Sequence, residues 1–93
     1  MPYIKREQRD QIDKHIETLA LAAKMIEGFE ANRGGILNYI ITRLAVDFCG
    51  KDSYSNLSLM RSAMEDASAE WYRRKMSGYE DAKCLENGEA YEL

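Results

Sequence analysis

The stretch ILNYIITRLAVDFC at residues 36–49 decides the fold class, because its apolar residues recur at the spacing of an α-helix. Successive members are four, three and four residues apart, which aligns them in one seam along the helix. The seam consists of Leu37, Ile41, Leu44 and Phe48. Gly50 follows where a glycine commonly ends a helix. The sequence therefore predicts an amphipathic helix from about residue 36 to residue 49.

A longer helix is predicted before this one, from about residue 5 to residue 29. Its apolar seam repeats at intervals of three and four residues, and its second half gains further apolar residues on the other side. A helix that is apolar nearly all round is buried on more than one side. Asn32, Gly34 and Gly35 tolerate a positive φ, so we expect a loop at residues 31–35.

A third helix is predicted from a cap at Ser53 or Ser55 to about residue 76. The dipeptide Ser77-Gly78 either breaks or bends it, and residues 79–86 are again helical until Asn87-Gly88. The tail at residues 89–93 alternates polar and apolar residues, which allows a short strand with the arm at residues 1–4 as its partner. The third seam consists of Leu57, Met60, Met64, Ala67 and Trp71.

These elements predict an all-α fold: a three-helix bundle with a short C-terminal helix and a tail. The long first helix forms a hairpin with the second, and the third packs across it. A chain of 93 residues suits one helical domain, residues 1–93. A hydrophobic content of 45% and a charged content of 31% are ordinary for a globular protein.

Composition also narrows the classes of partner. The net charge of −3 lacks the basic excess with which duplex-binding domains displace counterions, so we expect no binding to duplex nucleic acid. No apolar run reaches the roughly 18 residues of a membrane span, and the N-terminus lacks the apolar core of a signal peptide. Two cysteines and one histidine provide neither a disulfide framework nor a metal site. We expect a cytoplasmic protein without a cofactor.

The length of the first predicted helix bears on assembly. A helix of about 25 residues is roughly 37 Å long. A compact chain of this size has a radius of gyration of about 12 Å, so the helix overhangs it. A hairpin with a two-sided apolar helix usually buries the surplus against another copy. The sequence therefore predicts a homo-oligomer.

Arginine and tyrosine side chains form the candidate ligand site. Guanidinium groups bind phosphate through two hydrogen bonds, and aromatic faces stack on bases. Such a group could hold a nucleotide-derived ligand in a pocket shared by subunits. The competing interpretation is a set of local ion pairs, with Arg74 on Glu70 and Arg73 on Asp66 or Glu70. The candidate residues are Tyr39, Arg43, Arg73, Arg74 and Tyr79.

An acidic pair offers a weaker, enzymatic interpretation. Glu27 and Glu30 have the spacing that puts two carboxylates on one helical face, as magnesium-dependent nucleotide pyrophosphatases do. The best candidates for the second acidic pair are Glu65, Asp66 and Glu70, and their spacing is wrong for it. Solvated charge is therefore the favoured interpretation, and no metal site is predicted. With a single histidine, no nucleophile and base arrangement is visible, and no catalytic residue is predicted.

Several strings occur together in this chain. They are MPYIK at residues 1–5, LNYIITRL at 37–44, EWYRR at 70–74 and YEDAKCLENGE at 79–89. In these motifs the chain resembles a family of small, uncharacterised all-helical proteins from phages and prokaryotes. The resemblance covers most of the chain, which departs from the family in its alanine-rich first helix and in NRGG at 32–35. It implies a phage or mobile-element setting and carries no activity over.

Three hypotheses about function follow. The leading one is a small, oligomeric, non-enzymatic binding protein that sequesters a cyclic or linear nucleotide, as a phage sponge for a host immune signal would. The second is a protein-interaction module or an inhibitor of a host protein. The third is a magnesium-dependent nucleotide hydrolase.

Overall fold

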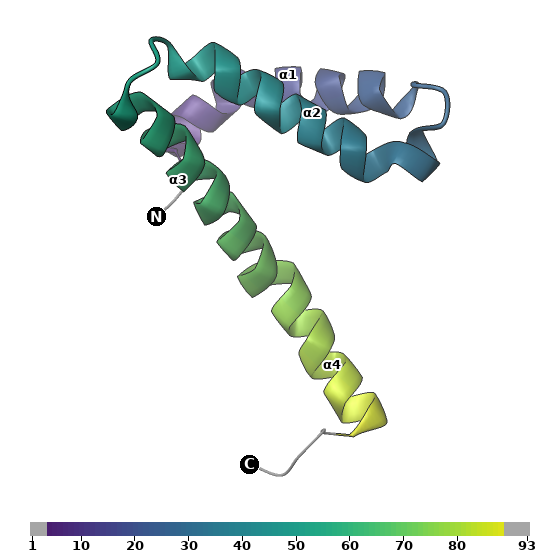
Figure 1. Ribbon diagram of the computed structural model, residues 1–93. Coiled ribbons are helices and arrows are strands. Elements are labelled where there is room, and N and C mark those ends of the chain that lie inside the picture. Colours follow the sequence, from purple (N-terminus) through teal and green to yellow (C-terminus); the bar gives the residue numbers. More distant parts are fainter. Residues whose placement is uncertain (1–3, 89–93) are drawn as a thin grey trace.

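The computed structural model describes residues 4–88 and confirms an all-α fold. Helices α1 (Arg6–Lys24) and α2 (Phe29–Cys49) form a hairpin (Figure 1). A single continuous helix of 34 residues follows, which we call the rod. The rod consists of α3 (Tyr54–Trp71), a π-helical turn η1 (Tyr72–Met76) and α4 (Ser77–Asn87). Residues 4–88 contain no β-strand.

The turn of the hairpin lies earlier in the chain than the sequence predicted. Helix α1 ends at Lys24 rather than near residue 29, and residues 31–35 belong to α2 instead of a loop. Gly28 adopts the left-handed conformation with φ 80°, so this glycine makes the turn. Asn32 kinks α2 with φ −118° and donates its side-chain amide to the Gly28 carbonyl at 2.9 Å. Gly34 therefore stays helical, which costs only about 1 kcal/mol relative to alanine.

The connection between α2 and α3 agrees with the sequence. Gly50 follows α2 with φ 73°, as a glycine C-cap does. Ser53 caps α3, because its Oγ accepts the Asn56 backbone N–H at 3.2 Å. The Asn56 side chain also donates to the Lys51 carbonyl at 2.9 Å. These bonds fix the corner from which the rod departs.

The rod, and not the first helix, is the longest element. The predicted break or bend at Ser77-Gly78 is a continuous helix, and Gly88 ends it with φ 89°. Thirty-four residues correspond to about 51 Å, which matches the longest dimension of the chain, 50 Å. Helix α1 has 19 residues instead of the expected 25. The predicted strand pairing of residues 1–4 with 89–93 lies, apart from Ile4, outside the described residues.

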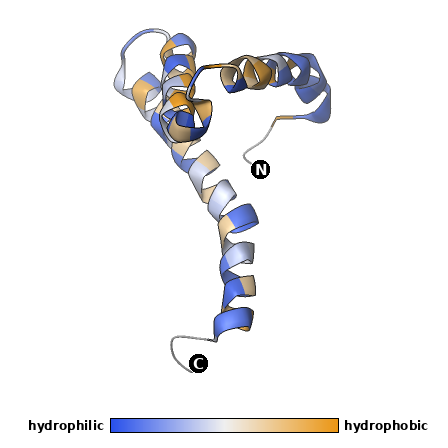
Figure 2. Ribbon diagram, turned by 90° about the vertical axis from the view of Figure 1, so that its right-hand side faces the viewer, coloured by the Kyte–Doolittle hydropathy of each residue, from blue (hydrophilic) through white to orange (hydrophobic). Residues whose placement is uncertain are grey.

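The helices of residues 4–88 do not enclose a hydrophobic core. Among the described helices, α2 contacts α1 on one side and α3 on the other, whereas η1 and α4 contact only neighbouring parts of the rod (Figure 1). The radius of gyration is 17.3 Å, against about 12 Å for a compact chain of this length. Among residues 4–88, only Ala23 is buried. Hydrophobic residues concentrate on the hairpin and the adjoining part of the rod (Figure 2). Most of this apolar surface therefore faces solvent.

Candidate functional site

Tyr39 and Arg43 form a pair on one face of α2, as their spacing predicted. Arg43 Nη1 donates to the Tyr39 hydroxyl at 3.3 Å. This hydrogen bond, followed by the charges of Tyr39 and Asp47, raises the pKa of Arg43 above its ordinary value. Both side chains are exposed. The pair thus presents a cation beside an aromatic ring.

The Glu70 carboxylate binds the side chains of both arginines of η1. Arg73 donates through Nε at 3.1 Å and through Nη2 at 2.6 Å to the two carboxylate oxygens, and Arg74 Nε donates at 3.3 Å. The Glu70 side chain is 15% exposed, whereas those of Arg73 and Arg74 are 63% and 62% exposed. The hydrogen bond from Arg73 is the main cause that lowers the pKa of Glu70. The structure therefore contains the ion pairs of the competing interpretation, and Glu70 is the partner of both arginines.

Tyr79 lies in α4, where the Lys83 ammonium sits 5.6 Å from the centre of its ring. Lys83 also pairs with Glu86 at 3.2 Å. Glu80 accepts a hydrogen bond from the Tyr72 hydroxyl at 3.0 Å, which raises the pKa of Tyr72. The sequence analysis did not predict this hydrogen bond, which joins two residues eight positions apart across the π-helical turn.

A single chain does not bring the five predicted residues together. Tyr39 and Arg43 lie on α2, Arg73 and Arg74 on η1, and Tyr79 on α4. Neither η1 nor α4 contacts α2. Each cation therefore has a local partner, and a common pocket for the whole set requires more than one copy.

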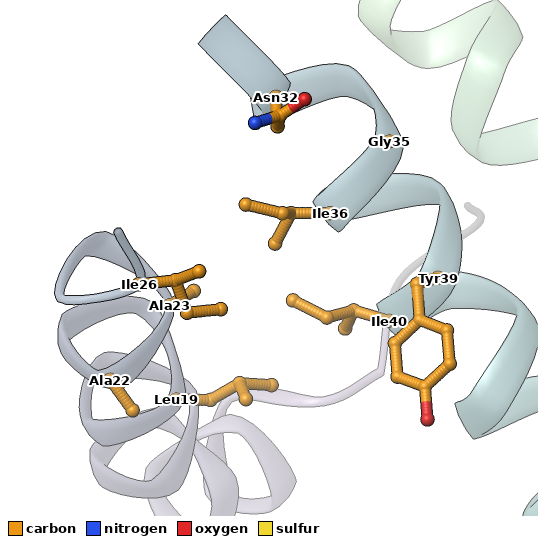
Figure 3. A pocket seen from close by; sticks show the side chains of 9 residues that line it. All are labelled: Leu19, Ala22, Ala23, Ile26, Asn32, Gly35, Ile36, Tyr39 and Ile40. Atoms are coloured by element: carbon orange, nitrogen blue, oxygen red, sulfur yellow. The ribbon is translucent and has the colours of Figure 1, made fainter. Parts of the chain in front are cut away.

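A hollow of about 530 Å³ separates the two helices of the hairpin. Leu19 and Ala23 of α1 and Ile26 of the hairpin turn lie opposite Ile36 and Ile40 of α2 (Figure 3). Tyr39 lies at the edge of this hollow beside Ile40. The lining is almost entirely apolar, so it suits hydrocarbon and not phosphate.

A second hollow, which we call the α2/α3 groove, has a volume of about 490 Å³ and opens between α2 and the rod. The predicted seam of α2 and, from Met60 onward, the predicted seam of α3 face it, and Trp71 stands at the end of its lining on α3. Ser68 is the only hydroxyl among the lining side chains, and none is charged. The lining residues are Leu37, Ile41, Leu44, Ala45, Phe48, Met60, Ala63, Met64, Ala67, Ser68 and Trp71.

The acidic pair does not share a helical face. Glu27 lies in the turn beyond α1, and Glu30 lies in the first turn of α2, where it pairs with Arg33 at 3.7 Å. The left-handed Gly28 between them causes this separation. In the described part of the chain, no group of three His, Cys, Asp or Glu residues could hold a metal ion.

Other sequence inferences concern single residues. Cys49 and Cys84 are not joined in a disulfide. His15 is exposed on α1. Within residues 4–88, no helix combines the length and hydropathy needed to cross a bilayer.

Comparison with known proteins yields one match. A family described as "Domain of unknown function (DUF6899)" matches residues 1–90. No curated protein sequence matches significantly, and neither does any solved structure. Function must therefore be argued from the geometry of the chain itself.

Proposed function

The chain belongs to the DUF6899 family, whose function is unknown, and we propose that it is a homo-oligomeric, non-enzymatic binding protein for a small nucleotide-type anion. One observation carries the proposal: among residues 4–88 of the isolated chain, only Ala23 is buried. The solvent-accessible surface is 8714 Å², whereas a compact monomer of this mass exposes about 5,500 Å².

The surplus of roughly 3,200 Å² per chain is larger than a monomer normally leaves uncovered. Much of it is apolar, since every large aliphatic seam residue of α2 is at least two-fifths exposed. Burial of apolar surface is the main free energy that opposes the entropy of the unfolded chain. Further copies of the chain are the simplest source of the missing burial, because most soluble oligomers are built from identical subunits.

The ligand class follows from the exposed cations and their aromatic neighbours. Arg43 beside Tyr39 and the arginine pair on Glu70 offer donors that suit phosphate oxygens, and tyrosine rings can stack on bases. Because these groups lie apart in one chain, the proposal requires assembly to bring groups of different copies together.

Mass measurement and calorimetry test the two parts of this proposal. Light scattering on the purified chain should give a mass of at least two copies. Titration with cyclic dinucleotides and linear nucleotides should release heat, and Arg43→Gln or Arg73→Gln should weaken binding by about tenfold or more. Arg33→Gln, which removes an exposed arginine of the hairpin paired at 3.7 Å, is the matched control. A monomeric mass, or no heat from any nucleotide, would refute the proposal. In a phage, such capture would remove a host immune signal.

One observation favours a second candidate, the protein-interaction module. The α2/α3 groove lacks the converging polar groups of a small-molecule site and suits the apolar face of a helix. A monomeric protein that captures one host protein in stoichiometric amount, and loses it on Leu44→Glu, would establish this function instead.

A further inference from the structure

The geometry points to a specific occupant for the α2/α3 groove: the α3 helix of a second copy, running antiparallel to the first about a two-fold axis. This inference rests on the oligomeric part of the proposed function and deepens it by naming the interface. Each copy would place its α3 in the groove of the other. The resulting core would contain α2 and α3 of both copies.

The seam of α3 has the periodicity of a coiled coil. Its members are three, four, three and four residues apart, which is the a/d pattern of a heptad. The seam residues are Leu57, Met60, Met64, Ala67 and Trp71. Even so, Leu57 is 52% exposed and Trp71 is 61% exposed in the single chain. The α2 seam has the matching spacing of four, three and four, so both walls of the groove can accept a helix by knobs-into-holes packing.

The α3 seam is complementary to itself when it is reversed. An axis between Glu65 and Asp66 sets Met60 against the partner's Trp71. The same axis sets Met64 against the partner's Ala67, so a large side chain faces a small one. A parallel pair in register would instead stack Met64 on Met64 and Ala67 on Ala67, which alternates crowding with voids. Reversal thus gives the more even packing.

Residues beside the seam permit close approach of the two helices. Ala63 and Ser68 flank it and line the groove, and both are small. Glu65 and Asp66 lie outside the seam by helical spacing, so the axis does not bring four carboxylates into the core.

The area to be covered fits an interface of the obligate class. Permanent homodimers bury about 2,000–5,000 Å² in total. Two chains of this shape together expose roughly 6,400 Å² more than two compact monomers would. A pair of interlocked grooves can therefore bury an obligate interface and still leave surface on α1. A loose contact of a few side chains would not remove the surplus.

Directed disulfide formation tests the antiparallel register. Met60→Cys and Trp71→Cys are made in separate proteins, each in a background of Cys49→Ser and Cys84→Ser. The two proteins are mixed, unfolded and refolded together, and oxidised. The mixture should form a disulfide between the two variants, because these positions face each other. Either variant alone should not, because two copies of position 60 would lie about 16 Å apart along the axis. Met64→Cys mixed with Ala67→Cys gives a second pair that retains Trp71.

A charge substitution provides an independent measurement on soluble protein. Met64→Glu, at the centre of the seam, should lower the mass in light scattering to that of one copy. Leu21→Glu is the matched control, because Leu21 is a large aliphatic residue of α1 that is 64% exposed and lies outside the groove. Helix content from circular dichroism shows whether each variant remains folded.

The outcomes separate this inference from the proposed function. Cross-linking only in the mixtures supports the antiparallel seam. An oligomer that binds nucleotides but cross-links between identical positions, or that dissociates with Leu21→Glu and not with Met64→Glu, would overturn the seam and leave the proposed function intact. A wild-type chain that is monomeric would overturn both.

Discussion

The proposed homo-oligomer predicts that dilution destabilises this protein, because its folded state would then depend on contacts between copies. For a dimer that unfolds in one step to two chains, a 100-fold dilution lowers the free energy of unfolding by about 2.7 kcal/mol. In the proposed dimer, two chains of 93 residues would form one cooperative unit of 186 residues. A unit of that size loses about 2–4 °C of melting temperature per kcal/mol. The melting temperature should therefore fall by about 5–11 °C over the 100-fold range.

Circular dichroism follows the melt at high concentration, and intrinsic fluorescence of Trp71 follows it at low concentration. Trp71 is suited to this assay because it is the single tryptophan and stands in the α2/α3 groove. Light scattering at each concentration confirms the mass. A melting temperature that stays constant over the whole range, together with a monomeric mass, would refute the reasoning that the apolar seams are covered by another copy.

Three further predictions concern single residues. If assembly buries Ile41, Ile41→Ala should lower the free energy of unfolding by about 2–5 kcal/mol. Met25→Ala should lower it little, because the Met25 side chain is 85% exposed in the hairpin turn. Denaturant titration measures both changes. Gly28→Ala should destabilise the folded chain by about 1–2 kcal/mol, because φ is 80° and the new Cβ would lie 3.1 Å from Asn32 Nδ2. Gly34→Ala should instead stabilise α2 by about 0.5–1 kcal/mol in the same melts, because the new Cβ would meet no other atom within 4 Å. The pKa of Glu70 is lowered, so its ion pairs stabilise the rod at a pH above its ordinary pKa of 4.5, and this stability is lost as the pH falls through the lower pKa of the folded state. Melts across that pH range should show a loss of stability in acid that is smaller in Glu70→Gln than in the wild type. An equal loss in both proteins would contradict this role.

Local periodicity made most of the fold predictable. The seam from Leu37 to Phe48 and, from Met60 to Trp71, the seam of α3 both line the α2/α3 groove, because each follows from helical spacing alone. Gly50 and Ser53 could be assigned because capping depends on the neighbouring backbone. The hairpin turn was misplaced because three glycines compete for it, and only Gly28 adopts a positive φ. Residue propensities alone do not show which glycine makes the turn, because the choice also depends on the hydrogen bond from the Asn32 side chain to the Gly28 carbonyl.

The candidate site was predictable only where it is local. Tyr39 with Arg43, and Arg74 with Glu70, are four residues apart and meet as helix neighbours do. Whether these groups converge depends on the angle between helices and on other copies, which residue spacing does not encode. The bond from Tyr72 to Glu80 depends on the π-helical turn, for which the sequence offered no signal.

The π-helical turn at Tyr72–Met76 changes the direction in which the side chains that follow it point around the axis of the rod. Such turns accommodate one extra residue in an otherwise regular helix, and one residue corresponds to a rotation of about 100° around the axis. The stripe that ends at Trp71 is consequently not continued on the same side of α4, so in the proposed dimer the contact between α3 helices would stop at that residue. Removing one residue from this turn would realign the two halves of the rod, lengthen the stripe, and change how many copies assemble.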